Sequence, residues 1–360
     1  MSQDQFRVAI VGIGAVAEMH ALALGDVEKA DLVAASCRTE SRGREFAAEF
    51  DCDYYADNEA MLDEVEPDVV NICTPSGAHL EPALAAAERG IHVLCEKPLE
   101  ITTDRIDEMV AAAEEAGIRL GGIFPQRYNP VVRTLHDAAE SGRFGGLSVV
   151  NTYVPWWRED DYYRDAWQGT QDLDGGGALM NQSIHGVDAV QWLAGTGVDA
   201  PREVNPVEEV FAYTDRLAHS GDIMEVEDTA VAVLRYRDGT LGQILGATSM
   251  YPGSLKRLQL AGRNGTAEVE EDELVTWQFR DEREEDAEIR SRFTTTETGG
   301  GAADPMSIDY ANHTRNIRDF LESVAADEPY MLDGTEARKA VEIIESIYKS
   351  AETGQPVRLE

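Results

Sequence analysis

Lysine is scarce in this chain, and acidic residues outnumber basic ones throughout. Among 360 residues there are 31 lysines and arginines against 68 aspartates and glutamates, a formal net charge of -37, and only five of the basic residues are lysine. So much negative charge excludes nucleic acid and anionic membranes as partners. A dispersed, lysine-poor acidic surface is typical of halophilic proteins, whose salt-loaded cytoplasm screens self-repulsion. The alternative is an ordinary acidic protein.

Cysteine is also rare, and long apolar runs are absent. The four cysteines, Cys37, Cys52, Cys73 and Cys95, form no Cys-x-x-Cys pair, so we expect no metal site. No segment has the length and apolarity of a membrane span, and no leader pattern is present. We therefore expect a soluble, cytoplasmic protein. A chain of this length suits two domains.

The first motif is a glycine-rich turn near the N-terminus. Val8–Val11 predicts a buried strand, and a helical pattern follows at about 15–25. In a Gly-x-Gly-x-x-Ala turn the first glycine permits the bend, the second lets a pyrophosphate approach, and the helix N-terminus faces the phosphates. A glycine turn of another α/β fold is the alternative. The residues expected to bind a dinucleotide here are Gly12, Gly14, Ala15 and Val16.

The end of the second predicted strand, 32–36, bears on the choice of nicotinamide cofactor. Cys37 stands near the position where NAD-binding chains carry an acidic residue for the ribose hydroxyl. Ser36, Arg38 and Arg42 could instead hold a 2′-phosphate, which favours NADP(H). NAD(H) stays possible, with Glu40 on the ribose and the arginines merely exposed.

Strands and helices alternate through the first part of the chain. Strands predicted at 68–73, 92–95 and 119–124 alternate with helices, which indicates a doubly wound parallel sheet of the Rossmann type in a domain spanning 1–124. Ligands bind at the carboxyl ends of such strands. There we expect cofactor contacts from Thr74, Pro75, His79, Glu96 and Lys97.

A second motif lies at Asp174–Leu193. Three glycines lead into a predicted helix on which Asn181, His185 and Asp188 are spaced i, i+4 and i+7, so they share one face. A histidine beside an amide on a helix face can accept a proton from a hydroxyl that the amide orients.

These motifs together resemble one family. Gly12-x-Gly14, Glu96-Lys97-Pro98 and the Gly-Gly to His185-x-x-Asp188 segment are similar to the Gfo/Idh/MocA family of NAD(P)-dependent sugar and polyol dehydrogenases. The resemblance implies a cis Lys97–Pro98 bond, a catalytic Lys97 reaching the reacting hydroxyl, and His185 as the base. Asn181 departs from the family's commonest residue, aspartate, and cannot take a proton. We therefore assign proton transfer to His185.

Two further segments carry the predicted substrate contacts. The resemblance implies that Arg127 lines the substrate cleft, although an ion-pair role is equally open. In the loop 155–170, aromatic rings with arginine and carboxylates suit a sugar, and a small core beneath a long loop is the alternative. The residues expected to bind substrate are Arg127, Trp156, Arg158, Tyr163, Trp167, Asn181 and His185.

Residues 125–360 form the second predicted domain, an α+β domain for substrate binding and oligomerisation. Alternation in 227–237 and 240–250, and a hairpin at Asn264–Gly265, predict an open, mainly antiparallel sheet. By resemblance its outer face builds a homodimer or homotetramer. Residues 281–304 show no periodicity and predict a loop, and helical patterns follow at 310–325 and 336–353, which could pack back on the first domain.

The leading hypothesis is an enzyme of the EC 1.1.1 type. It transfers a hydride between a nicotinamide and a secondary alcohol of a sugar, sugar derivative or cyclitol, with Lys97, His185 and Asn181 as catalytic residues. Two alternatives stay open. One is a glycosidase that uses a bound NAD in a transient oxidation, and the other is a non-catalytic nucleotide-binding sensor.

Overall fold

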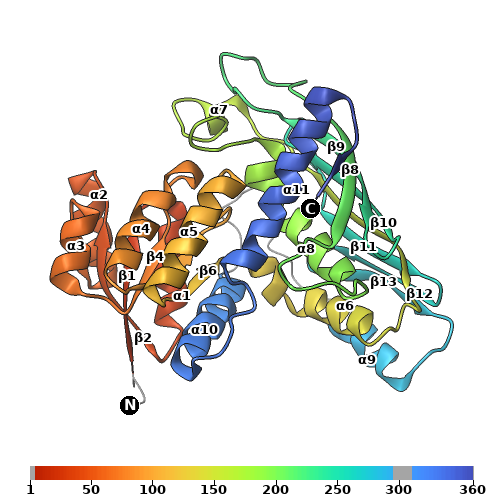
Figure 1. The fold of residues 1–360 in the computed structure, drawn as a ribbon, viewed down its shortest axis with the longest axis horizontal. Helices are drawn as coiled ribbons and strands as arrows, with labels where there is room; N and C mark the ends of the chain where they lie inside the picture. The colour runs from red at the N-terminus through yellow and green to blue at the C-terminus, as the bar shows by residue number, and fades with distance from the viewer. Residues whose placement is uncertain (1–4, 295–309, 360) are drawn as a thin grey trace. The chain divides into compact units, whose positions relative to one another are not determined.

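The computed structural model describes residues 5–294 and 310–359, which divide into two units (Figure 1). The first unit comprises Met1–Pro125 and Asp309–Arg338, and the second comprises Gln126–Ile308 and Lys339–Glu360. The division falls within the last helix, α11 (Gly334–Thr353). Each unit contains one sheet. Across the described ranges, no helix has the length and hydropathy needed to cross a membrane.

The first unit holds a six-stranded parallel sheet in the order β3-β2-β1-β4-β5-β6, which confirms the predicted doubly wound fold. Its strands are β1 (Phe6–Val11), β2 (Ala30–Ser36), β3 (Asp53–Tyr55), β4 (Val69–Ile72), β5 (His92–Cys95) and β6 (Leu120–Gly122). Its helices are α1 (Ala15–Gly25), α2 (Glu40–Phe50), α3 (Asn58–Val65), α4 (Leu80–Glu88), α5 (Thr103–Ala116) and α10 (Ala311–Ala326).

The strand order of this sheet positions one edge for ligand binding. The central strands β1, β4 and β5 are neighbours and almost wholly buried, as continuous apolar runs require in a sheet covered on both faces. Because the three strands are parallel, the segments that begin at Gly12, Cys73 and Glu96 leave the sheet at the same edge.

The second unit holds an eight-stranded sheet in the order β13-β12-β11-β7-β10-β9-β8-β14. All neighbours are antiparallel except β7 and β10, which confirms the predicted mainly antiparallel sheet. Its strands are β7 (Leu147–Pro155), β8 (Val207–Asp215), β9 (Thr229–Tyr236), β10 (Leu241–Ala247), β11 (Arg257–Gly262), β12 (Gly265–Glu270), β13 (Glu273–Phe279) and β14 (Val357–Arg358).

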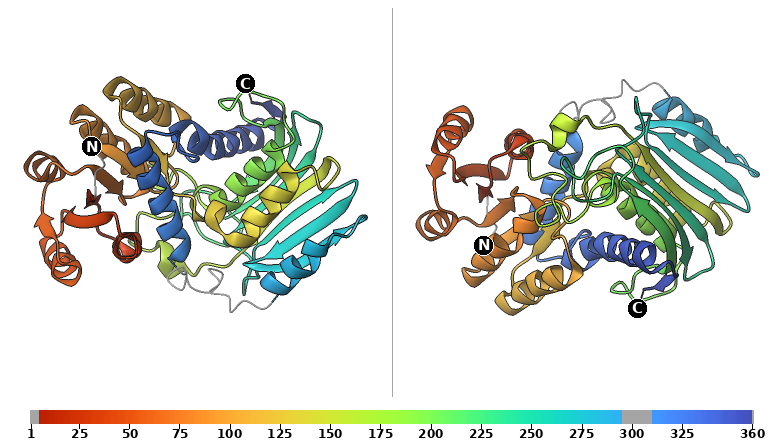
Figure 2. Two further views of the ribbon diagram at one scale, coloured as in Figure 1. Left: turned by 90° about the horizontal axis from the view of Figure 1, so that it is seen from below. Right: turned by 90° about the horizontal axis from the view of Figure 1, so that it is seen from above.

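The two faces of this sheet differ in what covers them. Helices α6 (Pro130–Glu140) and α8 (Ile184–Gly195) lie along one face, where α8 contacts β7 and β10 (Figure 2). The side chains that alternate to the other face stay accessible, and several are large and apolar. Those at least 38% exposed on the strands are Tyr213, Val231, Val233, Leu241 and Val275.

The region predicted as an aperiodic loop at 281–304 is partly helical. Helix α9 spans Glu284–Phe293, while 295–304 lies outside the described residues. Asp286 accepts a hydrogen bond from the Arg283 N–H and another from Trp277 Nε1, and it pairs with the buried Arg143. The prediction was wrong here because these partners, not an apolar period, hold the helix.

Candidate active site

The glycine-rich turn requires glycine at one position and leaves space at the other. Gly12 has φ +92°, and a Cβ there would lie 2.7 Å from the Thr74 backbone nitrogen. Gly14 caps α1 in an extended conformation, and a Cβ there would meet no atom within 4 Å. With Ala15 and Val16 opening the helix, the turn has the room and the N–H groups that a pyrophosphate needs.

The end of β2 separates the predicted ribose-binding residues. Ser36 is fully buried and its hydroxyl donates to Asn58 Oδ1 at 2.8 Å, so its side chain is committed within the fold. Arg42 Nη1 donates to the Ile13 carbonyl at 3.3 Å, which joins it to the glycine-rich turn. Arg38 is exposed and makes no ion pair with any residue of the described chain. Glu40 pairs with Arg44 instead, at 2.8 Å.

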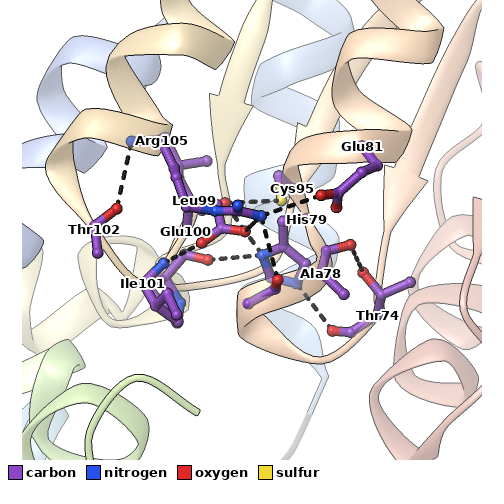
Figure 3. A network of polar contacts seen from close by, with 12 residues as sticks. Thr74, Ala78, His79, Glu81, Cys95, Leu99, Glu100, Ile101, Thr102 and Arg105 are labelled. Atoms are coloured by element: carbon purple, nitrogen blue, oxygen red, sulfur yellow. Dashed lines mark hydrogen bonds and ion pairs between the residues drawn. The ribbon is translucent and has the colours of Figure 1, made fainter. Parts of the chain in front are cut away.

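The turns that follow β4 and β5 are tied together (Figure 3). The Lys97–Pro98 bond is cis, as predicted. His79 is 1% exposed, and its Nδ1 lies 2.9 Å from the Pro98 carbonyl oxygen and 3.2 Å from that of Leu99. Its Nε2 lies 2.9 Å from the Thr74 carbonyl oxygen. The ring therefore serves these two turns rather than a ligand.

Glu96 belongs to a buried polar cluster. Its Oε1 lies 3.0 Å from His20 Nε2 and 4.0 Å from His313 Nε2, and its Oε2 accepts from the Lys97 N–H at 3.1 Å. Burial alone would lower the pKa of His20, but Cys73 and Glu96 beside it outweigh that and raise it. Burial would raise the pKa of Glu96, yet its bond to His20 and the neighbouring positive charges lower it. His20 and Glu96 are therefore a buried ion pair.

In the second unit, the three glycines before the predicted catalytic helix each have a local reason. Gly175 has φ +70°. A Cβ on Gly176 would lie 2.1 Å from the Tyr348 hydroxyl, and one on Gly177 would lie 1.9 Å from the Glu227 carbonyl oxygen. Only glycine lets these groups approach so closely.

The buried carboxylate of Glu227 caps the turn that follows. It accepts hydrogen bonds from the N–H groups of Gly177 and Leu179, both at 2.9 Å, and from the Tyr348 hydroxyl at 3.1 Å. Burial raises the pKa of Glu227 above its ordinary value, and these hydrogen bonds oppose the rise. The capped segment Ala178–Ser183 is a π-helix, a form found frequently at functional sites.

Two of the predicted catalytic residues are partly exposed within a segment that is otherwise buried. Between 176 and 191, Asn181 and His185 are the two residues that are not buried. His185 and Asp188 lie on α8, but Asn181 lies in the π-helix, so the predicted face of one continuous α-helix is only partly realised.

A chain of hydrogen bonds fixes Asn181. Its Nδ2 donates to Asp174 Oδ1 at 2.6 Å, and its Oδ1 accepts from Gln182 Nε2 at 2.9 Å. Gln182 in turn accepts from Arg158 Nη2 at 2.9 Å. Asp174 is fully buried and also accepts from the Gly169 N–H at 2.7 Å. The chain thus supplies a carboxylate to Asn181 from seven residues upstream.

Arg127 and Asp188 form a buried ion pair. Arg127 Nε and Nη2 donate to the two oxygens of Asp188 at 2.7 and 2.6 Å, and both side chains are at most 1% exposed. The guanidinium also lies over the Trp192 ring, 5.1 Å from its centroid. Of the two interpretations of Arg127, the ion pair is the one that the structure shows, so the side chain does not present itself to a substrate.

The aromatic loop contributes unequally. Tyr163 is 4% exposed, donates to Thr248 Oγ1 at 3.0 Å, and packs in a small cluster with Met224 and Val226. Arg158 lies over the Trp156 ring at 5.0 Å, and both are buried. Trp167 keeps partial exposure. The satellite-core interpretation therefore accounts for Tyr163, while Trp167 stays accessible.

Several residues of the site are not among those predicted from the sequence. His20, Asp174, Gln182, Glu227 and Tyr348 all bind predicted site residues or shape their turns. Asp174 could have been found, because it directly precedes the three glycines. Glu227 and Tyr348 come from distant segments and carry no local signal.

The fold and the residues of both units define an oxidoreductase with a dinucleotide-binding unit followed by an α/β unit. The protein-family model described as "Oxidoreductase family, NAD-binding Rossmann fold" matches residues 6–123. A second family model, "Oxidoreductase family, C-terminal alpha/beta domain", matches residues 137–359. The chain therefore belongs to the Gfo/Idh/MocA family of oxidoreductases, which confirms the resemblance.

Several characterised proteins are similar over nearly their whole length. The WlbA dehydrogenase of Bordetella pertussis, solved with NADH and UDP-GlcNAcA, has 30% identity and a TM-score of 0.87, covering 100% of this chain and 99% of its own. Myo-inositol 2-dehydrogenase of Thermotoga maritima is 26% identical over 98% of each chain. D-xylose 1-dehydrogenase (NADP(+)) 2 of Haloferax volcanii is 27% identical over 97% of each chain.

Proposed function

We propose that this enzyme transfers a hydride between a nicotinamide cofactor and a secondary alcohol of a sugar, sugar derivative or cyclitol. The observation that carries the proposal is the partial exposure of Asn181 and His185 in an otherwise buried segment. Asn181 is held there by its hydrogen bond to Asp174. Relatives that oxidise inositol and xylose, by their names, support it. The first unit binds the dinucleotide, and the second unit binds the substrate.

Each proposed catalytic residue has a distinct task. Lys97 hydrogen-bonds the reacting oxygen and stabilises its developing negative charge. His185 accepts the hydroxyl proton in oxidation and returns it in reduction. Asn181, with its amide fixed by Asp174 and Gln182, orients a neighbouring hydroxyl. A bound nicotinamide supplies or accepts the hydride, and Gly12 and Gly14 fit its pyrophosphate.

The His185→Ala variant tests this mechanism. Turnover should fall by about two to four orders of magnitude, because the variant lacks the proposed proton acceptor, while cofactor affinity is unchanged. His136→Ala is the matched control, since His136 is a partly buried histidine on α6 whose ring stacks on Trp192. Turnover near the wild-type level in His185→Ala would remove this residue from the mechanism.

We further propose that the enzyme prefers NADP(H). Arg38 is exposed, Arg42 reaches the glycine-rich turn, and the nearby Glu40 is paired with Arg44. A 2′-phosphate would therefore meet two guanidinium groups, while the carboxylate of Glu40 is already paired.

Arginine substitutions separate the two cofactors. For Arg38→Ala and Arg42→Ala we expect the KM for NADP⁺ to rise by roughly 10- to 100-fold each, as the loss of a charge-assisted hydrogen bond predicts, with little change for NAD⁺. Arg89→Ala is the control, because Arg89 follows α4 and pairs with Asp63 instead of lying at the predicted ribose site. Equal KM changes for both cofactors would contradict the preference.

Substrate contacts are proposed for the accessible side of the aromatic loop. Trp167 stacks on an apolar sugar face, while Arg158 and Trp156 stack on each other and stay buried. Trp167→Ala should raise the KM for the sugar without changing the KM for the cofactor, as measured by initial rates.

We also propose a cytoplasmic, salt-adapted homo-oligomer that associates through the outer face of the second sheet. Val233 and Val231 are exposed there, and Tyr213 lies opposite Val231 on β8. Light scattering should show that Val233→Asp lowers the molar mass to that of a monomer. The control Leu22→Asp changes an exposed leucine of α1 and should keep the assembly. A wild-type monomer would refute the proposal.

A further inference from the structure

The ring of His79 faces acceptors only. Nδ1 lies near the carbonyl oxygens of Pro98 and Leu99, and Nε2 lies near that of Thr74. A neutral imidazole has one N–H, so one of its nitrogens would direct a lone pair at a carbonyl lone pair. Buried polar groups are almost always satisfied, so the geometry favours a ring that donates on both sides. It crosslinks the turn after β4 to the turn that follows Lys97.

An ion pair with a buried carboxylate lies next to this crosslink. Glu100, whose side chain is fully buried, accepts from the Ile101 N–H at 2.6 Å and pairs with Arg105 at 2.9 Å (Figure 3). Arg105 also donates to the Gly77 carbonyl at 3.4 Å, in the same turn as His79. The turn after Lys97 is therefore attached to the turn after β4 at two places.

On the other side of Lys97, His20 acts through Glu96. Its Nε2 bonds to Glu96 Oε1, and the second oxygen of Glu96 accepts from the Lys97 N–H. Its Nδ1 lies 3.1 Å from Asn71 Nδ2, while Asn71 Oδ1 is buried and has no hydrogen-bond partner among the residues that the structure describes. Exchanging the two atoms of that amide would place its oxygen toward His20 and let a positively charged His20 donate to both neighbours.

We propose that His79 and His20 are positioning residues that hold the Lys97 turn from both sides. His79 holds the carbonyl groups of the two residues that follow Lys97. His20 holds the Glu96 carboxylate, which accepts a hydrogen bond from the Lys97 N–H. Neither histidine touches a reacting atom. The catalytic consequence rests on the proposed function, because it takes Lys97 to be the residue that binds the reacting oxygen.

The scarcity of lysine makes the position of Lys97 directly measurable. The chain has five lysines, so protein labelled with ¹³C at the lysine ε-carbon gives five signals, and Lys97→Arg identifies the one from Lys97. In His79→Ala and His20→Gln we expect the Lys97 signal to shift or broaden while the other four stay in place. An unchanged Lys97 signal in folded His79→Ala would overturn the proposed positioning role.

His92→Ala is the matched control. His92 lies on β5, the strand that leads into Lys97, but at its opposite end, where its Nδ1 accepts from the Arg119 N–H at 2.9 Å. This variant should leave all five lysine signals unchanged. A shift of the Lys97 signal as large as in His79→Ala would mean that any histidine lost from the sheet disturbs the turn, and would contradict a specific role.

A second measurement uses the unmutated protein and does not depend on the stability of a variant. Ring ¹⁵N shifts of the seven histidines, assigned through contacts to neighbouring protons, report whether each nitrogen carries a proton. Both nitrogens of His79 and of His20 should be protonated at neutral pH. A neutral ring at His79 would refute the crosslink.

Kinetics give the arm that depends on the proposed function. In His79→Ala we expect kcat to fall by up to about a hundredfold, as small misplacements of catalytic groups do, with the KM for the cofactor unchanged. A parallel rise of the cofactor KM with kcat unchanged would make His79 a cofactor residue. If no substrate is turned over, the lysine and histidine NMR measurements still test the positioning role.

Discussion

The substitution Asp188→Asn probes the buried ion pair that anchors the catalytic helix. It keeps the shape of the side chain and one hydrogen bond acceptor, but it removes the negative charge that faces the guanidinium of Arg127. Both side chains are at most 1% exposed, so water cannot replace the lost carboxylate. Removing one partner of such a pair costs about 3–5 kcal/mol of unfolding free energy.

That loss is large compared with the stability of the whole unit. Folded domains have about 5–15 kcal/mol in total, and the midpoint of thermal unfolding falls by roughly 2–4 °C per kcal/mol for 150–250 residues. We therefore expect a decrease on the order of 6–20 °C for Asp188→Asn. All five tryptophans lie in the second unit, so their fluorescence during urea or thermal unfolding follows this unit.

Two further variants make the test specific. Asp161→Asn removes the carboxylate of an exposed aspartate–arginine pair in the same unit, Asp161 with Arg164, and should change the midpoint little. The double variant Arg127→Met with Asp188→Leu removes both charges and should be more stable than Asp188→Asn alone. A midpoint for Asp188→Asn that matches Asp161→Asn, or a double variant as unstable as the single one, would refute the reasoning.

Three other predictions concern stability. Gly177→Ala should cost about 1–3 kcal/mol of unfolding free energy and disturb the π-helix, because its Cβ meets the Glu227 carbonyl, whereas Gly25→Ala, with nothing within 4 Å, should be tolerated; equal urea midpoints would contradict this. His20 has a raised pKa and Glu96 a lowered one, so their pairing stabilises the first unit most between about pH 4.5 and 6.5. That contribution should be lost as the pH rises through the folded pKa of His20 or falls toward that of Glu96. Unfolding followed by circular dichroism should show that stability depends less on pH in the alkaline range in His20→Gln than in the wild type. The net charge of -37 predicts that the melting temperature rises between about 0.1 and 1 M KCl, as the Debye length falls from about 10 to 3 Å; a constant melting temperature would contradict salt adaptation.

Much of the fold could be predicted because its signals are local. The helix expected between the strands predicted at 92–95 and 119–124, which is α5, and the hairpin at Asn264–Gly265 are both present, since a polar cap with an apolar period and an Asn-Gly turn act over a few residues. The parallel pairing of β7 with β10 inside an antiparallel sheet has no such signal. It depends on how segments almost a hundred residues apart meet.

The candidate site was predictable to the same degree. Gly12 stands in a turn whose spacing points to it, His185 is indicated by helical spacing together with the family resemblance, and Lys97 is indicated by the resemblance. Whether Arg127 binds a substrate or a carboxylate depends on Asp188, which is 61 residues away. Likewise the π-helix at Asn181 depends on the buried Glu227, so an α-helical spacing rule could not foresee it.

The central claim is hydride transfer to or from a nicotinamide, and nicotinamide absorbance tests it most directly. The purified protein in molar KCl would receive NADP⁺ or NAD⁺ together with a panel of aldoses, cyclitols and uronic acids. We predict reduction of NADP⁺, faster than of NAD⁺, with at least one member of the panel, and its loss in Lys97→Ala and His185→Ala. Folded protein that binds the cofactor but reduces neither nucleotide with any member would contradict the claim. Cleavage of a glycoside without a net absorbance change would then identify the transient-oxidation alternative.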